Sequence, residues 1–201
     1  MNIIDQFNIQ RYHKEQMAAY GEDNARALGW KTEEGQFKRF EILSQIGDLE
    51  NCSVLDAGCG YGDLCGFLNQ RFTGMRYIGI DLEDVFLERA TQRYSNSGET
   101  AFFTGDVTKA ELPFTDYILA SGIFNYPNSD TEYLFKTIVK LFNNCRIGFG
   151  FNLLDKTEAT NSLLVTYDRH RVLAFCKTLS NSVVLKENYY ENDFTIMMYT
   201  R

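Results

Sequence analysis

The sequence has little of what builds metal sites, linkers or flexible tails. Its 201 residues include two histidines and five cysteines, and no two cysteines stand in the C-x-x-C spacing typical of zinc ligands. There are two prolines, and no stretch is dominated by glycine, serine or charge of one sign. We therefore expect no metal site, and one domain over residues 1–201.

Long apolar runs and a basic excess are also missing. No run approaches the roughly 20 apolar residues that cross a bilayer, and the first residues, MNIIDQFNIQ, lack the pattern of a secretion signal. With 20 basic and 27 acidic residues, the formal net charge is −7, which disfavours a protein that grips phosphate backbones. We expect a cytoplasmic protein whose partner is neither a membrane nor a nucleic acid.

Apolar residues are plentiful, at 44% of the chain, and their spacing alternates between two periods. Helical spacing covers residues 5–19, 32–46, 63–71, 84–94, 130–142 and 168–178, and Thr32 is a candidate N-cap. Short strand-like runs cover residues 52–56, 75–80, 100–104, 116–120 and 146–151. Strand–helix units of this length need crossover connections, so they predict a doubly wound α/β fold with helices on both faces of a parallel sheet.

The last quarter of the chain changes rhythm. Residues 182–187 and 194–200 are apolar runs separated by a short polar and aromatic segment. They predict a closing β-hairpin, which would give a mostly parallel sheet an antiparallel C-terminal part.

The segment VLDAGCGYGDL, residues 54–64, ends a predicted strand with an acid and then places three glycines in five positions. In a doubly wound sheet, such a loop lets the backbone approach a cofactor closely. A dinucleotide fingerprint is G-x-G-x-x-G, with the pyrophosphate on the helix N-terminus. Here Asp63 stands at the third glycine position, and its carboxylate would repel a pyrophosphate. The loop therefore favours a cofactor with an amino-acid end and no phosphate.

Two further acids stand where an adenosine needs them. Asp81 ends the next predicted strand, about 20 residues beyond the glycine loop, the separation at which a carboxylate meets ribose hydroxyls. Asp106 follows the third strand, where it can accept from the adenine amine while Val107 packs beside the ring. Together with Asp56, these acids follow successive strands beside one glycine loop, and they predict a nucleoside site.

Through VLDAGCGYG, YIGID and GDV, the sequence resembles the class I S-adenosylmethionine-dependent methyltransferases over about residues 51–151. The segments ALGWKTEEGQFKRFEIL and ILASGIFNY extend the resemblance to small stand-alone bacterial members. The resemblance implies a Rossmann-like seven-stranded sheet whose sixth and seventh strands form the antiparallel pair. It also implies a helical lid over residues 1–50, a core over residues 51–201, and S-adenosylmethionine as the cofactor.

The resemblance also carries expected roles onto residues of this chain. Asp56, Gly58 and Gly60 would face the methionine part of the cofactor, Asp81 the ribose, and Asp106 with Val107 the adenine. The other residues expected around the cofactor are Trp30, Gln36, Arg39, Ala57, Cys59, Leu82, Ser121 and Gly122.

The sequence indicates catalytic residues less clearly than cofactor-binding residues. Methyl transfer needs an in-line nucleophile, with a base only where the acceptor must lose a proton. The segment ASGIFNYPNSD lacks the Asn/Asp-Pro-Pro-aromatic pattern of enzymes that methylate amino groups of bases or glutamine, so we expect a small-molecule acceptor. The candidate catalytic residues are His13, Tyr20 and Asn125. His13 is preferred over His170 because it lies on the expected lid.

Two alternatives remain open at this point. A protein that binds S-adenosylmethionine without chemistry would show the same loop. An NAD(P)-dependent oxidoreductase is disfavoured by Asp63 and by the absence of a Tyr-x-x-x-Lys motif.

Overall fold

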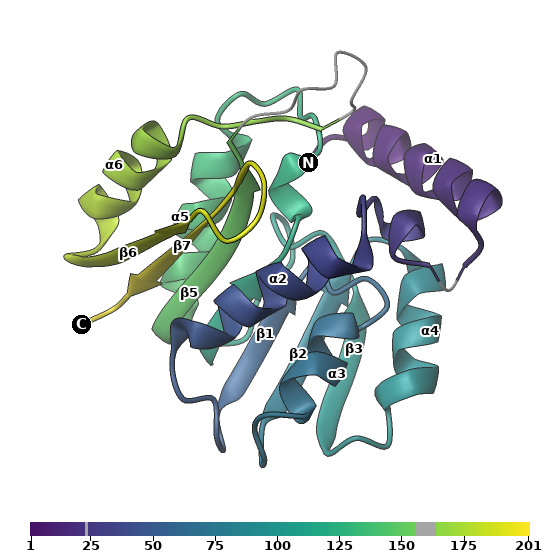
Figure 1. Cartoon of the computed structure of the whole chain (residues 1–201), viewed down its shortest axis with the longest axis horizontal. Helices are drawn as coiled ribbons and strands as arrows, with labels where there is room; N and C mark the ends of the chain where they lie inside the picture. The colour runs from purple at the N-terminus through teal and green to yellow at the C-terminus, as the bar shows by residue number, and fades with distance from the viewer. Residues whose placement is uncertain (23, 156–163) are drawn as a thin grey trace.

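The fold is built around one sheet, seen in the computed structural model of the chain, which describes residues 1–22, 24–155 and 164–201 (Figure 1). The strands are β1 (Ser53–Ala57), β2 (Arg76–Asp81), β3 (Glu99–Thr104), β4 (Thr115–Ala120), β5 (Cys145–Leu154), β6 (Ser182–Glu187) and β7 (Asp193–Tyr199). They form a seven-stranded sheet in the order β3-β2-β1-β4-β5-β7-β6. The order reverses at β1, which places the glycine turn at the switch point of the sheet.

Strands β1 to β5 run parallel, and β7 runs antiparallel to both β5 and β6. The expected Rossmann-like sheet with an antiparallel C-terminal hairpin is therefore confirmed. The hairpin is not simply added at the edge of the sheet, because its second strand, β7, lies between β5 and β6. β7 pairs with β5 from Gly148 opposite Tyr199 to Leu154 opposite Asp193, and β6 forms the outer edge.

Six α-helices and three short 3-10 helices are present in the described chain. They are α1 (Ile3–Tyr20), η1 (Ala25–Leu28), α2 (Glu33–Leu43), η2 (Ser44–Ile46), α3 (Asp63–Asn69), α4 (Asp84–Tyr94), η3 (Ile123–Asn125), α5 (Tyr133–Asn143) and α6 (Arg169–Leu179). Thr32 caps α2 as predicted, since its side chain accepts from the Gly35 amide at 3.0 Å. None of the helices in the described ranges is long and apolar enough to cross a bilayer.

Side chains that alternate along the strands pack into two hydrophobic cores, one on each face of the sheet. Leu55 and Ile118 belong to the core that includes side chains of α5 and α6. Val54 and Leu119 belong to the core that includes side chains of α2 and α3. The segments α1 and η1 lie over one end of the sheet (Figure 1).

Candidate functional site

A cavity of about 200 Å³ opens at the carboxyl ends of β1, β2 and β4, and residues of α1, η1 and α2 form its opposite wall. Such a position outside the strand ends is where open α/β sheets bind ligands. The sequence-predicted residues that line it are His13, Trp30, Gln36, Arg39, Asp56, Gly58, Cys59, Gly60, Asp81, Leu82, Asp106, Val107, Ser121, Gly122 and Asn125.

Two expected residues lie elsewhere. Ala57 ends β1 with its side chain in the hydrophobic core. Tyr20 is the last residue of α1, is 45% exposed, and faces the guanidinium of Arg26 at 5.3 Å. It shares a helical face with His13 but stands seven residues later, which is about 10 Å further along the helix axis. This distance along α1 separates Tyr20 from the cavity.

The glycine turn after β1 needs its glycines for two reasons. Gly58 and Gly60 have positive φ angles of 76° and 54°, a region that favours glycine. In addition, a Cβ at Gly58 would lie 1.9 Å from Cγ2 of Ile123 in η3. The turn is held to the next strand by the Gly58 amide, which donates to the Ile80 carbonyl at 2.7 Å. The backbone of β1 therefore reaches the cavity without an intervening side chain.

Asp56 is the last residue but one of β1, which is buried throughout, and lines the cavity with 1% of its surface exposed. Its Oδ2 accepts from the Tyr77 hydroxyl, whereas Oδ1 has no donor among the described residues. Burial raises the pKa of Asp56 to about 7, although the Tyr77 hydrogen bond acts in the opposite direction. A buried carboxylate oxygen without a donor is costly, so the site suits a ligand that brings a cationic N–H group.

Asp81 and Glu83 form the acidic edge of the cavity at the end of β2. Asp81 accepts from the Gly60 amide at 2.8 Å and from the Glu83 amide at 3.1 Å, so it joins the glycine turn to the start of α4. Glu83 was not predicted. Its Oε1 has no donor within the described chain, and burial, with Asp81 and Asp84 nearby, raises the pKa of Glu83 to about 7. The run of acids in IDLED is the signal that could have indicated it.

His13 is buried on α1 and lines the cavity near Asp81. Its Nδ1 lies 3.1 Å from the Ala27 carbonyl, which assigns the proton to Nδ1 and leaves Nε2 as an acceptor. Its ring makes edge contacts with Phe86 and Tyr126. Burial lowers the pKa of His13, and the Ala27 carbonyl and Asp81 oppose this effect. The imidazole is therefore a neutral acceptor on the β2 side of the cavity.

The turn after β4 is held in place by Asn152 of β5, which is 0% exposed. Asn152 Oδ1 accepts from the Gly122 amide at 3.0 Å, and Asn152 Nδ2 donates to Ser121 Oγ at 3.2 Å. Asn125 Oδ1 in turn accepts from the Leu154 amide at 3.2 Å. Asn152 was missed by the sequence reasoning, although a polar residue inside the apolar strand GFGFNLL is a usable signal.

Arg39 of α2 forms the opposite wall with two aromatic rings. Its guanidinium carbon lies 4.6 Å from the centre of the Trp30 ring and 6.0 Å from that of Tyr190. Nη2 donates to Asp193 Oδ1 at 2.7 Å, which ties α2 to β7. Trp30 also covers the turn after β4, because a Cβ at Gly122 would lie 2.9 Å from its ring.

Gln36 faces the glycine turn from the same helix as Arg39, but its amide is already engaged. Gln36 Nε2 donates to Asp63 Oδ2 at 3.1 Å, and Arg93 Nη1 donates to Asp63 Oδ1 at 3.0 Å. Burial raises the pKa of Asp63, and the Gln36 and Arg93 donors oppose this effect. Asp63 therefore connects the N-terminus of α3 to α2 and α4.

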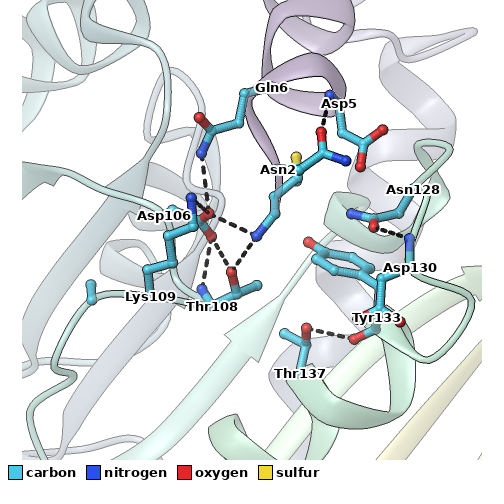
Figure 2. Close-up of polar contacts among 12 residues, drawn as sticks. Asn2, Asp5, Gln6, Asp106, Thr108, Lys109, Asn128, Asp130, Tyr133 and Thr137 are labelled. Carbon is cyan, nitrogen blue, oxygen red and sulfur yellow. Dashed lines mark hydrogen bonds and ion pairs between the residues drawn. The ribbon is translucent and has the colours of Figure 1, made fainter.

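Asp106 lies at the far end of the cavity, beside the buried Val107. Its Oδ1 accepts from the Thr108 amide at 2.9 Å and the Thr108 hydroxyl at 2.6 Å. Its Oδ2 accepts from the Met1 ammonium and from Gln6 Nε2, both at 3.1 Å (Figure 2). Burial alone would raise the pKa of Asp106, but the Thr108 donors and the Met1 ammonium lower it below the usual range.

Comparisons with known proteins agree with this geometry. A family profile described as "Methyltransferase domain" matches residues 54–144, which run from β1 through α5. The Mycobacterium tuberculosis protein "Putative methyltransferase Rv1506c" is 32% identical over 155 residues, covering 73% of this chain and 92% of that protein.

Solved structures with the same fold include two methyltransferases. Magnesium protoporphyrin IX methyltransferase from Synechocystis, with bound S-adenosylmethionine, has a TM-score of 0.72 at 16% identity and covers 100% of this chain and 99% of its own. Phosphoethanolamine N-methyltransferase 1 from Haemonchus contortus, with phosphoethanolamine and S-adenosylhomocysteine, has a TM-score of 0.76 at 11% identity. That match covers 99% of this chain and 50% of the other.

Proposed function

The chain belongs to the S-adenosylmethionine-dependent methyltransferases, and from this premise we propose that it methylates a small-molecule acceptor. The two solved relatives are named for a magnesium porphyrin and for phosphoethanolamine, so the shared fold does not define the acceptor. A small acceptor is supported by a cavity walled on opposite sides by α2 and η3. The net charge of −7 disfavours nucleic acid.

The observation that carries the cofactor assignment is the Oδ1 of the buried Asp56, which has no donor in the part of the chain that the structure describes. The cofactor's methionine part has an ammonium group, which supplies the missing donor. Its carboxylate fits Arg39, which uses one nitrogen on Asp193 and has no other acceptor among the described residues. Gly58 and Gly60, which line the cavity, present backbone rather than side chains to the part of the cofactor between these two groups.

We place the nucleoside along the rest of the cavity. Asp81, whose position is fixed by two backbone amides, faces the ribose hydroxyls. His13 Nε2 is an acceptor on the same side, so we assign His13 to the ribose rather than to proton removal from the acceptor. Asp106 and Val107 then receive the adenine, with Leu82 beside it.

The bound cofactor would supply an electrophilic methyl group, and the residues of the chain would hold the acceptor in position next to it. The turn after β4, from Ser121 to Asn125, is fixed by Asn152 and faces Trp30 of the opposite wall. Holding the acceptor in line with the methyl group accounts for much of the rate in such a transfer. Asn125 lines this part of the cavity, and its amide nitrogen is the group we expect to orient the acceptor.

Two further proposals concern arrangement and location. Residues 1–50 form the lid over the core of residues 51–201, supported by the side chains of α1, η1 and α2 in the cavity wall. A cytoplasmic location is supported by the five cysteines, all of which are free thiols, because a reducing compartment keeps them so.

Calorimetric titration of the purified protein with S-adenosylmethionine, S-adenosylhomocysteine and NADH tests the proposal. We expect micromolar binding of the first two and none of NADH. Asp81→Ala should weaken binding at least about tenfold, since a half-buried charged acceptor is lost. Glu88→Ala, which removes an exposed acid of α4, is the matched control and should bind as the wild type does.

Incubation with S-adenosylmethionine and a panel of small hydroxy, amino and carboxy compounds then tests the chemistry. Formation of S-adenosylhomocysteine that depends on an acceptor supports the enzyme. Cofactor binding without product from any acceptor would favour the non-catalytic alternative, and tight binding of NADH alone would contradict the cofactor assignment.

A further inference from the structure

The first six residues lie across the adenine end of the cavity. We call this segment, Met1–Gln6, the N-terminal strap; it includes the first turn of α1. Met1 lines the cavity and packs against the core under α5 and α6. Figure 2 shows the side chain of Gln6 directed at Asp106, while Asp5 points toward the segment that precedes α5.

The strap and Thr108 together fill the hydrogen-bonding capacity of Asp106. An ionised carboxylate has about four acceptor positions. Four donors occupy them: the amide and hydroxyl of Thr108, the Met1 ammonium, and Gln6 Nε2. Lys109 adds an ion pair at 3.8 Å. A fifth donor, such as an adenine amine, can bind Oδ2 only if a donor of the strap leaves.

A second anchor holds the strap at a distance from Asp106. Asp5 Oδ2 accepts from the amide and hydroxyl of Ser129, at 3.0 and 2.8 Å. Asn2 Nδ2 donates to the same hydroxyl at 2.6 Å, and Asn2 Oδ1 caps α1 by accepting from the Asp5 amide at 2.8 Å. The strap is thus bound at both Asp106 and Ser129.

We propose that the N-terminal strap competes with the cofactor for Asp106, so that the adenine amine binds there only after Gln6 and its neighbours have moved away. This inference rests on the proposed role of Asp106 in adenine binding. Because only the open state accepts the adenine, the apparent affinity is reduced by the fraction of molecules in which the strap is open. Contacts that hold the strap closed therefore weaken cofactor binding, even where they touch no part of the cofactor.

Two variants loosen the strap at different anchors. Gln6→Ala removes a donor to Asp106, and Ser129→Ala removes the hydroxyl that bonds Asp5 and Asn2 without changing any residue of the cavity wall. With the same N-terminus in every protein, calorimetry with S-adenosylhomocysteine should show about fivefold tighter binding for Gln6→Ala, the effect of one lost hydrogen bond on the closed state, and at least as large a gain for Ser129→Ala, which loses two. Gln10→Ala, on the exposed face of α1, is the control and should not change affinity.

Hydrogen exchange gives a readout independent of affinity. The Ser129 amide donates to Asp5 Oδ2 in the closed strap. Saturating S-adenosylhomocysteine should speed the exchange of this amide if the strap opens, whereas unchanged or slower exchange would show that the strap stays closed over the cofactor and would overturn the proposal.

A change of ligand tests whether the adenine amine reaches Asp106. S-inosylhomocysteine, which has a carbonyl in place of the amine, should bind more weakly than S-adenosylhomocysteine to the wild type. Equal binding of the two, or unchanged or weaker binding of S-adenosylhomocysteine in both strap variants, would overturn the competition while leaving the cofactor site standing. Failure of S-adenosylhomocysteine to bind any of the proteins would overturn the proposed function itself.

Discussion

Asp56 shows how a single residue can favour ligand binding at the expense of folding. The carboxylate is buried, one of its oxygens has no donor in the described structure, and Asp81 and Asp63 are close enough to raise its pKa further. Such an arrangement destabilises the ligand-free protein and is relieved when the carboxylate takes up a proton or a cationic group binds. Binding sites commonly carry costs of this kind.

Asp56→Asn should therefore raise stability and weaken cofactor binding. The pKa of Asp56 is about 7 in the folded protein against roughly 3.9 unfolded, so the folded state binds the extra proton between these values. Its contribution to the free energy of unfolding thus falls as pH rises from about 4 to 7. Asparagine cannot ionise, so we expect a gain on the order of 2 kcal/mol, or several degrees, at pH 8.

Thermal unfolding at pH 5 and pH 8 checks this expectation, because the gain should be larger at pH 8. The same variant should bind S-adenosylhomocysteine at least about tenfold more weakly by calorimetry. In the wild type, affinity should fall as pH drops below about 7, since the cofactor's ammonium needs the ionised carboxylate. A variant that melts below the wild type at pH 8 would mean that the charge on Asp56 is already compensated.

At the scale of elements, the turn after β4 depends on a neighbouring strand. Its residues make the cavity wall, yet Asn152 of β5 satisfies the Gly122 amide and the Ser121 hydroxyl. Trp30 packs on this turn from the other wall. A change at Asn152 should therefore reach Trp30 through this turn.

Asn152→Leu should displace this turn while the sheet still forms, because leucine preserves the volume but leaves both turn groups unpaired. Trp30 is the one tryptophan in the sequence, so its fluorescence reports on the turn directly. We expect a red-shifted emission maximum and a methyl-transfer rate reduced roughly tenfold or more.

Asn181→Leu, in the exposed turn before β6, is the control and should leave the emission spectrum unchanged. An unchanged spectrum in Asn152→Leu itself would show that the turn does not need this side chain.

Helices and strands with their own apolar period could be predicted from the sequence. Features that depend on contacts between distant parts of the chain could not. Residues 84–94 and 182–187 were predicted with the bounds that α4 and β6 have. The insertion of β7 between β5 and β6 was not, because strand order depends on which edges meet after folding. The 3-10 segments η1 and η3 were also missed, since three or four residues show no period, whereas η2 lies inside the helix predicted over residues 32–46.

The same distinction between local patterns and distant contacts applies to the residues of the site. Asp56, Asp81 and Asp106 were predicted to gather because parallel strands bring their carboxyl ends to one edge. The pairing of Arg39 with Asp193 joins residues far apart in the chain, so no local pattern indicated it.

At the scale of the whole molecule, the cavity lies between the sheet and the segments packed over its end. A ligand that contacts both walls should stabilise the entire fold, because it binds the folded state alone. S-adenosylhomocysteine at 100 times its dissociation constant should add about 2.7 kcal/mol to the free energy of unfolding, which is roughly 5–10 °C in a domain of this size.

Thermal unfolding with and without the ligand measures this effect, and NADH at the same concentration is the control. Asp56→Asn should lose most of the shift. A shift with NADH as large as that with S-adenosylhomocysteine would contradict the cofactor assignment.

The acids gathered around the cavity also set up a negative potential at its mouth. Arg39, Lys31 and the Met1 ammonium line the same space but are outnumbered by acidic residues, which are Asp56, Asp63, Asp81, Glu83, Asp106 and Glu191. The methyl donor carries a net positive charge, whereas the demethylated product is neutral overall. Electrostatic steering should therefore speed the arrival of the donor, more so at low ionic strength, and should act little on the product. Loss of the sulfonium charge on methyl transfer thus weakens the attraction between the cofactor and this wall, which should favour product release.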